Sequence, residues 1–330
     1  MIDLQMNNKD FYRQNLLADT PIFHQPFWLD IVHGESWNVA LVKKDNKIVA
    51  SMPYSFQESE RGLIIKLPIL TQFLGPHFNI SAGKRVSRYS SETEIIQELL
   101  NQIPDFYSFH QHWNFEYQNW LPFYWNNYLQ TSRYTYFIDA ARSNEDIWDG
   151  FKDTLRNEIR KSENILEIVE AHDCIKLYDL VVMTFQSQGA KPPYSFALLN
   201  TIFEALKEKE KCKILLATNN NEVFAGLLMI MDAKTSYYLV GGFNRNIKTG
   251  GALSKLIWEA IKISKAQGLN FDFEGSMLPG VEPYFRHFGG ERKAYFSISK
   301  ISEKNEANER KSRKYHLIES LRHFKKFIKP

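Results

Sequence analysis

A hairpin pattern that occurs twice constrains the fold of this chain more than any other feature of its sequence. Residues 37–54 read "WNVALVKKDNKIVASMPY" and residues 212–230 read "CKILLATNNNEVFAGLLMI". Each stretch holds two β-rich runs separated by a polar, Asn-containing turn, which is typical of a β-hairpin. Aligning Asn46 with Asn221 gives an offset of 175 residues, about half of the 330-residue chain. The repeat predicts that one structural unit is present twice.

The segments around the hairpins follow a similar order in both halves. "ILTQFLGPHF" (residues 69–78) and "SYYLVGGFN" (residues 236–244) each predict a further strand that ends at a glycine turn. Capping residues and apolar spacings of three and four predict helices between the strands. These helices span residues 91–103, 143–164, 174–188, 196–208 and 250–266, and "LNFDFE" (residues 269–274) is a further strand. The sequence therefore predicts a mixed α/β (α+β) protein.

Length and charge suggest how the chain is divided. A chain of 330 residues accommodates two domains, and a fresh helix cap near residues 140–143 predicts a boundary there. We expect an N-terminal domain over residues 1–140, a C-terminal and catalytic domain over residues 141–301, and a tail over residues 302–330. The tail carries nine Lys or Arg against four Glu, a net charge of +5, whereas the whole chain carries +3.

The tail predicts a basic amphipathic helix, because apolar residues recur at spacings of four, three and four. These residues are Leu317, Leu321, Phe324 and Ile328. Such a helix could contact an anionic membrane, bind tRNA or dock on its own protein.

Several classes of protein are disfavoured by composition. Only two cysteines are present, Cys174 and Cys212, so neither a disulfide framework nor a zinc site is expected, and no other metal is expected. The first residues lack the apolar segment of a signal peptide, and the longest apolar stretch is too short to span a bilayer. We therefore expect a cytoplasmic protein.

Three short motifs carry a resemblance to a known family. "QFLGPHF" (residues 72–78), "LRNEIRKSEN" (residues 155–164) and "VEPYFRHFGGE" (residues 281–291) resemble segments of the Fem peptidyltransferases and related Fem-like N-acetyltransferases. The meander, the helix that starts at glycines and the next strand also follow the order of a GNAT acyltransferase domain. The resemblance implies two GNAT-like (acyl-CoA N-acyltransferase) domains in tandem.

The resemblance also implies an activity, namely transfer of an acyl or aminoacyl group to an amine. The donor would be an acyl-CoA or an aminoacyl-tRNA, and the acceptor a small molecule or a peptidoglycan-precursor-like amine. The stretch "NRNIKTGGALSKL" departs from the usual pyrophosphate-loop pattern, because Ile247 stands where Arg or Gln is expected. A binding protein that retains the fold without its chemistry, or an RNA-binding module, therefore remains an alternative.

The donor site is predicted at two glycine-containing segments. Unpaired N–H groups at a helix N-terminus suit a phosphate, and a bulged strand leaves backbone N–H groups that can hold an oxyanion. The predicted donor-binding residues are Val240, Gly241, Gly242, Lys248, Thr249, Gly250, Gly251 and Ala252. The alternative for the glycine pair is a plain strand-to-helix turn that uses glycine for its positive φ.

Two residues are predicted to be catalytic. Asp272 and Glu274 alternate with phenylalanines, which predicts one shared strand face, and Glu274 at the strand end is the predicted general base. Tyr238 is the predicted proton donor to the leaving group. An ion pair for Glu274 and core packing for Tyr238 are the structural alternatives.

Acceptor binding is predicted at a basic helix and at the aromatic loop that follows "FDFEGS". The helix offers cations for phosphate, and the loop offers pocket walls and one cation. The predicted acceptor-binding residues are Arg156, Arg160, Lys161, Tyr284, Phe285, Arg286 and Phe288. A solvated basic face and a core-capping loop are the alternatives, and the first domain is expected to shape the acceptor groove.

Overall fold

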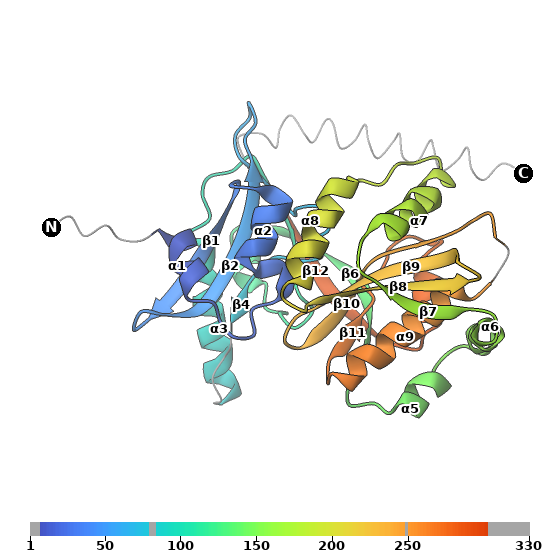
Figure 1. Cartoon of the computed structure of the whole chain (residues 1–330). Helices are drawn as coiled ribbons and strands as arrows, with labels where there is room; N and C mark the ends of the chain where they lie inside the picture. The colour runs from blue at the N-terminus through green and yellow to red at the C-terminus, as the bar shows by residue number, and fades with distance from the viewer. Residues whose placement is uncertain (1–6, 79–83, 248–249, 303–330) are drawn as a thin grey trace, which may run out of the picture.

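One twelve-stranded mixed sheet runs through the molecule, and helices cover both of its faces (Figure 1). The structure is a computed structural model, and it describes residues 7–78, 84–247 and 250–302. The first half contains α1 (Asn8–Gln14), η1 (Ile22–His24), α2 (Pro26–His33), β1 (Trp37–Lys44), β2 (Lys47–Gln57), β3 (Ile64–Lys66), β4 (His77–Phe78), α3 (Arg85–Leu100), β5 (Ser108–His112), α4 (Leu121–Trp125) and β6 (Leu129–Ile138).

The second half repeats the order of helices, meander, helix and strand. It contains α5 (Asn144–Asp149), α6 (Asp153–Glu163), β7 (Glu167–Ala171), α7 (Ile175–Gln186), α8 (Phe196–Lys207), β8 (Cys212–Asn219), β9 (Glu222–Met231), β10 (Thr235–Phe243), α9 (Ala252–Ala266), β11 (Asn270–Asp272), α10 (Glu282–Arg286) and β12 (Glu291–Ile301). None of the helices in the described ranges is long and apolar enough to cross a membrane.

The two halves exchange their last strands at the centre of the sheet. The strand order is β1-β2-β3-β5-β12-β6-β11-β10-β9-β8-β7, and β4 pairs with β2 off this path. β12 therefore pairs with β5 of the first half, whereas β6 pairs with β11 of the second half. β6 and β12 also pair antiparallel with each other, from Glu291 opposite Phe137 to Ser299 opposite Leu129. Neither half can complete its sheet without a strand from the other.

The duplicated hairpin is confirmed down to its irregularities. Asp45 and Asn46 have positive φ, and so do Asn220 and Asn221 at the equivalent positions of the second hairpin. Two consecutive residues of positive φ make the type I′ turn that a two-residue hairpin favours. The register shift that follows Val42 in β1 also recurs at the equivalent position of β8, after Ala217.

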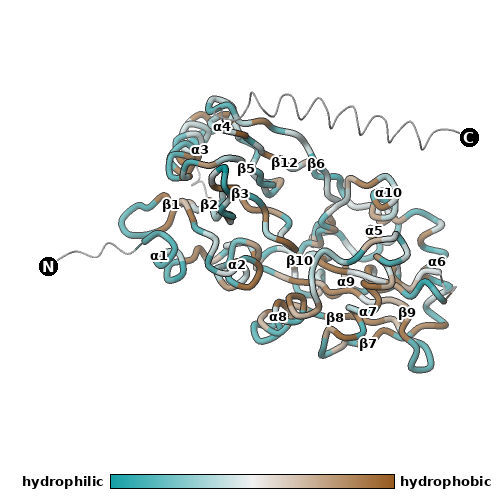
Figure 2. The backbone as a smooth tube through the Cα atoms, turned by 90° about the horizontal axis from the view of Figure 1, so that it is seen from above, coloured by the Kyte–Doolittle hydropathy of each residue, from teal (hydrophilic) through white to brown (hydrophobic). Residues whose placement is uncertain are grey.

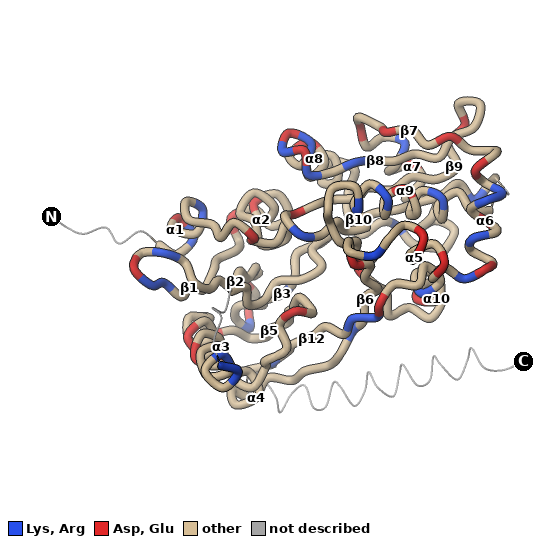
Figure 3. Tube along the Cα trace, turned by 90° about the horizontal axis from the view of Figure 1, so that it is seen from below, with Lys and Arg blue, Asp and Glu red and all other residues tan. Residues whose placement is uncertain are grey.

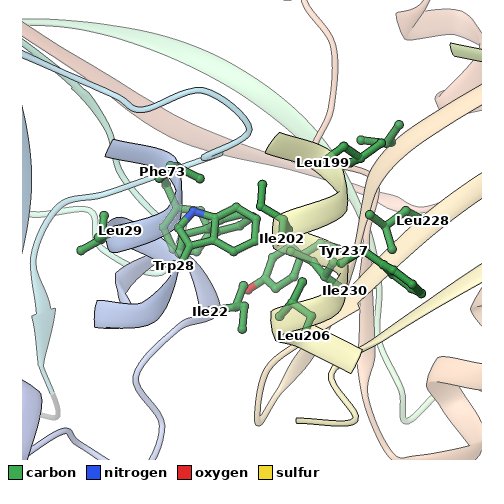
Figure 4. Close-up of a cluster of buried hydrophobic side chains, with 14 of the residues drawn as sticks. Ile22, Trp28, Leu29, Phe73, Leu199, Ile202, Leu206, Leu228, Ile230 and Tyr237 are labelled. Carbon is green, nitrogen blue, oxygen red and sulfur yellow. The ribbon is translucent and has the colours of Figure 1, made fainter. Parts of the chain in front are cut away.

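A hydrophobic core joins the two halves on one face of the sheet. Figure 4 shows Trp28 and Phe73 of the first half against Ile202 and Tyr237 of the second. The ring of Phe23 packs edge-on against Trp28 and Tyr237, each with centroids 5.2 Å apart. Two further cores lie beneath α3 and α4 and beneath α9 and α10. Figure 2 shows hydrophobic stretches on β8 and β9 alongside hydrophilic turns.

Several predicted elements were wrong in detail. The helix expected at residues 91–103 is α3, which begins at Arg85, and the strand expected at residues 269–274 is β11, which ends at Asp272. The strand expected at residues 69–78 is mostly a loop, because Leu70 and Gly75 adopt positive φ and the ring of Trp113 packs on Gly75. The third strand of that meander is β3 instead. The helix expected at residues 143–164 is divided into α5 and α6 near Gly150. The predicted domain boundary at residues 140–141 falls between β6 and α5, and nearly all of the predicted tail lies outside the described residues.

The shared core predicts that the two halves unfold together. Leu206 is fully buried in this core, so Leu206→Ala should lower the free energy of unfolding by about 2–5 kcal/mol. Urea unfolding should give coincident transitions by tryptophan fluorescence and by circular dichroism. Leu278→Ala, at a side chain that is 63% exposed, is the control and should change stability by less than about 0.5 kcal/mol. Two separate transitions would contradict a joint core.

Candidate active site

A cleft opens where β10 and β11 diverge. The two strands pair in parallel only from Thr235 opposite Asn270 to Tyr237 opposite Asp272. Directly afterwards, β10 shifts its register on β9 between Tyr238 and Val240. Bulged and diverging strands leave backbone N–H groups without a ladder partner. The bulge predicted from the sequence therefore lies at the mouth of the cleft.

Two consecutive residues turn the chain out of β11 and keep the cleft open. β11 ends at Asp272, and Glu274 and Gly275 both have positive φ, so the prediction that Asp272 and Glu274 share one strand face was wrong. Gly275 lies directly on the backbone of Tyr134, where an added Cβ would come within 2.1 Å of the carbonyl oxygen. A glycine is therefore required at this crossing with β6.

A cavity of about 650 Å³ extends from the bulged part of β10 to the N-terminus of α9, and neither Asp272 nor Glu274 lines it. This volume lies within the range of ligand pockets, roughly 300–1,000 Å³. The lining residues come from β9, β10, α6, α7, α9, α10 and the adjoining loops. They are Glu158, Thr184, Gln188, Phe224, Tyr238, Gly241, Phe243, Asn244, Arg245, Ile247, Gly250, Gly251, Ala252, Leu253, Ser254, Gly280, Val281, Tyr284 and Phe285.

The first turn of α9 forms one end of the cavity. Gly251 caps the helix with φ of 87°, and an added Cβ would come within 2.5 Å of the Glu158 carbonyl oxygen. Gly250 differs, because an added Cβ there would meet no atom within 4 Å. The free N–H groups of the first turn give this end a partial positive charge. Lys248 and Thr249 lie outside the described residues.

Two tyrosines line the cavity. The side chain of Tyr238 folds back over Gly241, and its ring packs edge-on against Phe285 at 5.7 Å. The hydroxyl of Tyr284 lies 3.1 Å from the hydroxyl of Ser254, which connects α10 to α9. Burial raises the pKa of both phenols above the ordinary value of 10, so both stay protonated at neutral pH.

Asp272 and Glu274 lie at the edge of the cleft, and their carboxyl groups differ in hydrogen bonding. Asp272 accepts hydrogen bonds from the Thr135 hydroxyl and from the backbone N–H of Glu274, while burial raises its pKa from 3.8 to about 6. Glu274 is partly exposed as a whole, but its Oε1 is buried and has no partner among the described residues. Burial and the nearby Asp272 raise the pKa of Glu274 well above 4.5. A carboxylate of this kind suits proton abstraction.

Several predicted donor and acceptor residues lie away from the cavity. Val240 is buried in the core that joins the halves, and Gly242 packs against the backbone of Leu180 in α7. Phe288 is fully buried beside Phe151, and the exposed Arg286 lies 3.6 Å from the carboxylate of Glu282.

The basic helix also points elsewhere. Arg156 forms ion pairs with Asp149 and Asp153, and Arg160 lies over the ring of Trp148. Lys161 is exposed. The structure therefore brings Gly241, Gly250, Gly251, Ala252, Tyr238, Tyr284 and Phe285 together, but not these three cations.

The sequence analysis did not single out several polar residues of the cavity, among them Arg245, Thr184, Gln188 and Glu158. Arg245 stacks on Phe243, and Thr184 accepts a hydrogen bond from the N–H of Phe243. Gln188, which follows α7, and Glu158 of α6 also line the cavity. Arg245 directly follows the glycine strand and could have been considered. Nothing local in the sequence identifies the other three, because their position depends on how the helices pack.

Comparison with known proteins identifies the fold. Residues 150–286 match the family model described as "Acetyltransferase (GNAT) domain". The chain resembles FemX in structure, with a TM-score of 0.62 and 11% identity over 90% of this chain and 96% of that chain. L-PGS from Bacillus licheniformis gives a TM-score of 0.52 and 10% identity over 89% of this chain and 90% of that chain. A conserved protein of unknown function from Bacteroides thetaiotaomicron VPI-5482 gives 0.55 and 10% identity over 88% and 94%.

No curated protein sequence matches the chain. The chain has a tandem-GNAT fold like that of FemX, and residues 150–286 match the GNAT acetyltransferase domain model. The predicted fold class is confirmed, and the family match supports an acyltransferase in general terms. Donor and acceptor remain predictions.

Substitutions at the neighbouring residues Gly250 and Gly251 should have different effects, one on ligand binding and the other on folding. Gly251→Ala should lower the free energy of unfolding by roughly 1–3 kcal/mol, because the added Cβ meets the α6 backbone at positive φ. Gly250→Leu should leave the melting temperature nearly unchanged and fill part of the cavity. Thermal melts of both variants and of Gly250→Ala provide the comparison. Equal destabilisation at both positions would contradict the geometry.

Asp272 gives a prediction for the pH dependence of stability. Its folded pKa of about 6 lies above 3.8, so the stability from the protonated carboxyl is complete below about pH 4 and is lost as the pH rises through 6. That difference corresponds to roughly 3 kcal/mol. Asp272→Asn keeps the Oδ1 acceptor and mimics the protonated form. The variant should therefore be more stable than the parent at pH 8, by about 1–3 kcal/mol, and similar near pH 4.

Urea unfolding at pH 4.5 and pH 8 tests this expectation. If Asp272→Asn is less stable than the parent at pH 8, the carboxylate contributes to folding and the argument from burial is wrong.

Proposed function

We propose that this protein is an acyltransferase that moves an acyl or aminoacyl group to an amine, at the cleft between β10 and β11. The observation that carries the proposal is that the bulged strand, the start of α9 and two protonated tyrosines meet in one cavity of about 650 Å³. A donor phosphate would lie at the first turn of α9, and the acyl group would reach Gly241.

The chemistry follows from the groups at the cleft. The amine nitrogen attacks the carbonyl carbon of a thioester or ester, and a C–N bond forms while the C–S or C–O bond breaks. The N–H of Gly241 would stabilise the oxyanion of the tetrahedral intermediate. Glu274 accepts the proton of the attacking amine, and Tyr238 donates a proton to the departing sulfur or oxygen.

The donor is an acyl-CoA or an aminoacyl-tRNA, and both carry phosphates that suit the same end of the cavity. Arg245 is the lining cation within the described residues, and the acidic Glu158 faces the same cavity. Because the same end of the cavity suits both donors, acetyl-CoA and an aminoacyl-tRNA should be titrated side by side against the parent protein and against Gly250→Leu. Binding of one donor that weakens at least tenfold in Gly250→Leu supports the proposal. Binding of neither donor, or equal binding by both proteins, argues for a fold retained without this chemistry.

Glu274→Gln tests the role of the base. Gln keeps the size of the side chain but cannot accept the proton, so turnover should fall by about a hundredfold to ten-thousandfold while donor affinity and melting temperature stay close to the parent's. In the parent, activity should rise with pH through a pKa above 4.5, since the base works as the carboxylate. That acid limb should be absent in Glu274→Gln. A parent-like rate and pH profile in the variant would remove Glu274 from the mechanism.

A further inference from the structure

A cluster of polar side chains lies on the central strands, on the sheet face that joins the halves. His112 of β5 lies opposite Ser297 of β12, and Tyr295 of β12 lies opposite Arg133 of β6. His110 and His112 are two residues apart, as are Tyr295 and Ser297, so all five share one face. The other face of these strands is apolar, with Phe109 and Ile298 buried beneath α3 and α4.

Short contacts tie the five side chains into one group. His110 Nε2 lies 3.0 Å from Ser297 Oγ, and Arg133 Nε donates to the Tyr295 hydroxyl at 3.2 Å. The rings of His110 and His112 are 5.0 Å apart, and His112 and Tyr295 are 5.7 Å apart. We call these residues the histidine–arginine cluster.

The cluster contains a positive charge without an ion-pair partner and an imidazole nitrogen without a hydrogen-bond partner among the described residues. Arg133 is partly buried and forms no ion pair with a carboxylate among the described residues, whereas Lys293 on the same face lies 2.6 Å from Glu291. His112 Nε2 is buried without a hydrogen-bond partner in the part of the chain described. Burial, together with the charge of Arg133, lowers the pKa of both histidines, that of His112 to about 4. An anion beside them would oppose both effects.

The cluster adjoins the proposed base. His112 Nδ1 lies 3.3 Å from the backbone oxygen of Gln72, whose side-chain amide donates to the backbone oxygen of Glu274 at 3.0 Å. A water-sized cavity of about 10 Å³ lies among Gln72, Thr135, Asp272 and Tyr295. The pKa of Tyr295 is raised by burial and lowered by Arg133, and Asp272 and Glu274 both raise it further. The cluster and the two carboxyls are therefore within electrostatic reach of one another.

Asp272 shares this face, because it lies opposite Tyr237 of the joining core. The donor cavity is lined by α9 and α10, which cover the other face, and by α7, whereas none of its lining residues comes from β5, β6 or β12. An amine that attacks at the cleft while its proton passes to Glu274 can therefore approach over the histidine–arginine cluster. Basic residues of this part of the sheet include Arg133 of β6 and Arg292 and Lys293 of β12, and Figure 3 shows Lys and Arg positions beside β6, where the two halves meet.

We propose that the histidine–arginine cluster binds an anionic group of the acceptor, a phosphate or a carboxylate, and so directs its amine to Glu274. A guanidinium beside imidazole and hydroxyl groups is the set of donors that such oxyanions require. This inference rests on the proposed function for the identity of the ligand, but the anion site itself can be tested without a reaction.

Inorganic phosphate and succinate are the probes, titrated at pH 7 and constant ionic strength. The readout is the NMR signals of the imidazole C–H groups, assigned with His110→Asn and His112→Asn. Either anion should displace the His110 signals and raise the pKa of His110, and Arg133→Gln should weaken binding roughly tenfold or more. Arg292→Gln is the matched control. Arg292 also belongs to the central strands, beside Lys293, but its side chain lies over Tyr134 on the opposite face.

The outcomes separate this inference from the proposed function. Binding that Arg133→Gln loses and Arg292→Gln retains supports the site, and the stronger probe identifies phosphate or carboxylate. The inference is overturned if the His110 signals do not move with either probe up to 100 mM, which is roughly a hundredfold above a 1 mM dissociation constant. It is also overturned if Arg133→Gln and Arg292→Gln bind the anion equally well. If the anion site holds while neither acyl donor binds the parent, the proposed function fails alone. If a donor binds while the anion site fails, only the inference falls.

Discussion

The antiparallel pairing of β6 with β12 is the contact on which the rest of the structure depends. Each of these strands ends one half of the chain but lies beside a strand of the other half. The exchange makes a single sheet from two GNAT-like units, and the core around Trp28, Phe73 and Tyr237 joins them on one face. Pairing strands that lie far apart in the sequence costs loop-closure entropy, which this shared core offsets.

The exchange also positions the candidate active site. β6 supplies the Tyr134 backbone on which Gly275 turns and the Thr135 hydroxyl that holds Asp272. The end of β11, and with it Glu274, is therefore fixed by a strand from the first half. Gln72, from the first half, adds a hydrogen bond to the Glu274 backbone. The carboxyl that we propose as the base thus depends on both halves, although the donor cavity is lined by residues of the second half alone.

Local signals in the sequence predicted local structure well. The Asx-rich turns specify type I′ hairpins, so their recurrence in the second half was readable, and the glycines before α9 marked a helix start at the cavity. The strand exchange was not readable, because nothing in β6 or β12 encodes which distant strand each pairs with. The same limit explains the loop at residues 69–78, whose conformation depends on contact between Gly75 and Trp113.

The site residues likewise fall into those that local sequence motifs predicted and those that only tertiary structure brings together. Gly241, Gly250 and Tyr284 were identified because they belong to short motifs, whereas Arg156 is engaged by two nearby aspartates that a helical spacing argument does not weigh. Arg245 and the histidine–arginine cluster escaped notice, since single polar residues on separate strands carry no motif. Tertiary structure alone brings them together.

Amide hydrogen exchange in the presence of donor tests the central claim most directly. The account holds that an acyl donor occupies the cleft between β10 and β11 and contacts the first turn of α9. Saturating acetyl-CoA or aminoacyl-tRNA should therefore slow exchange at residues 240–243 and 252–254, with little change in β1 and β2. Slowed exchange confined to other segments, or none with either donor, would contradict the account.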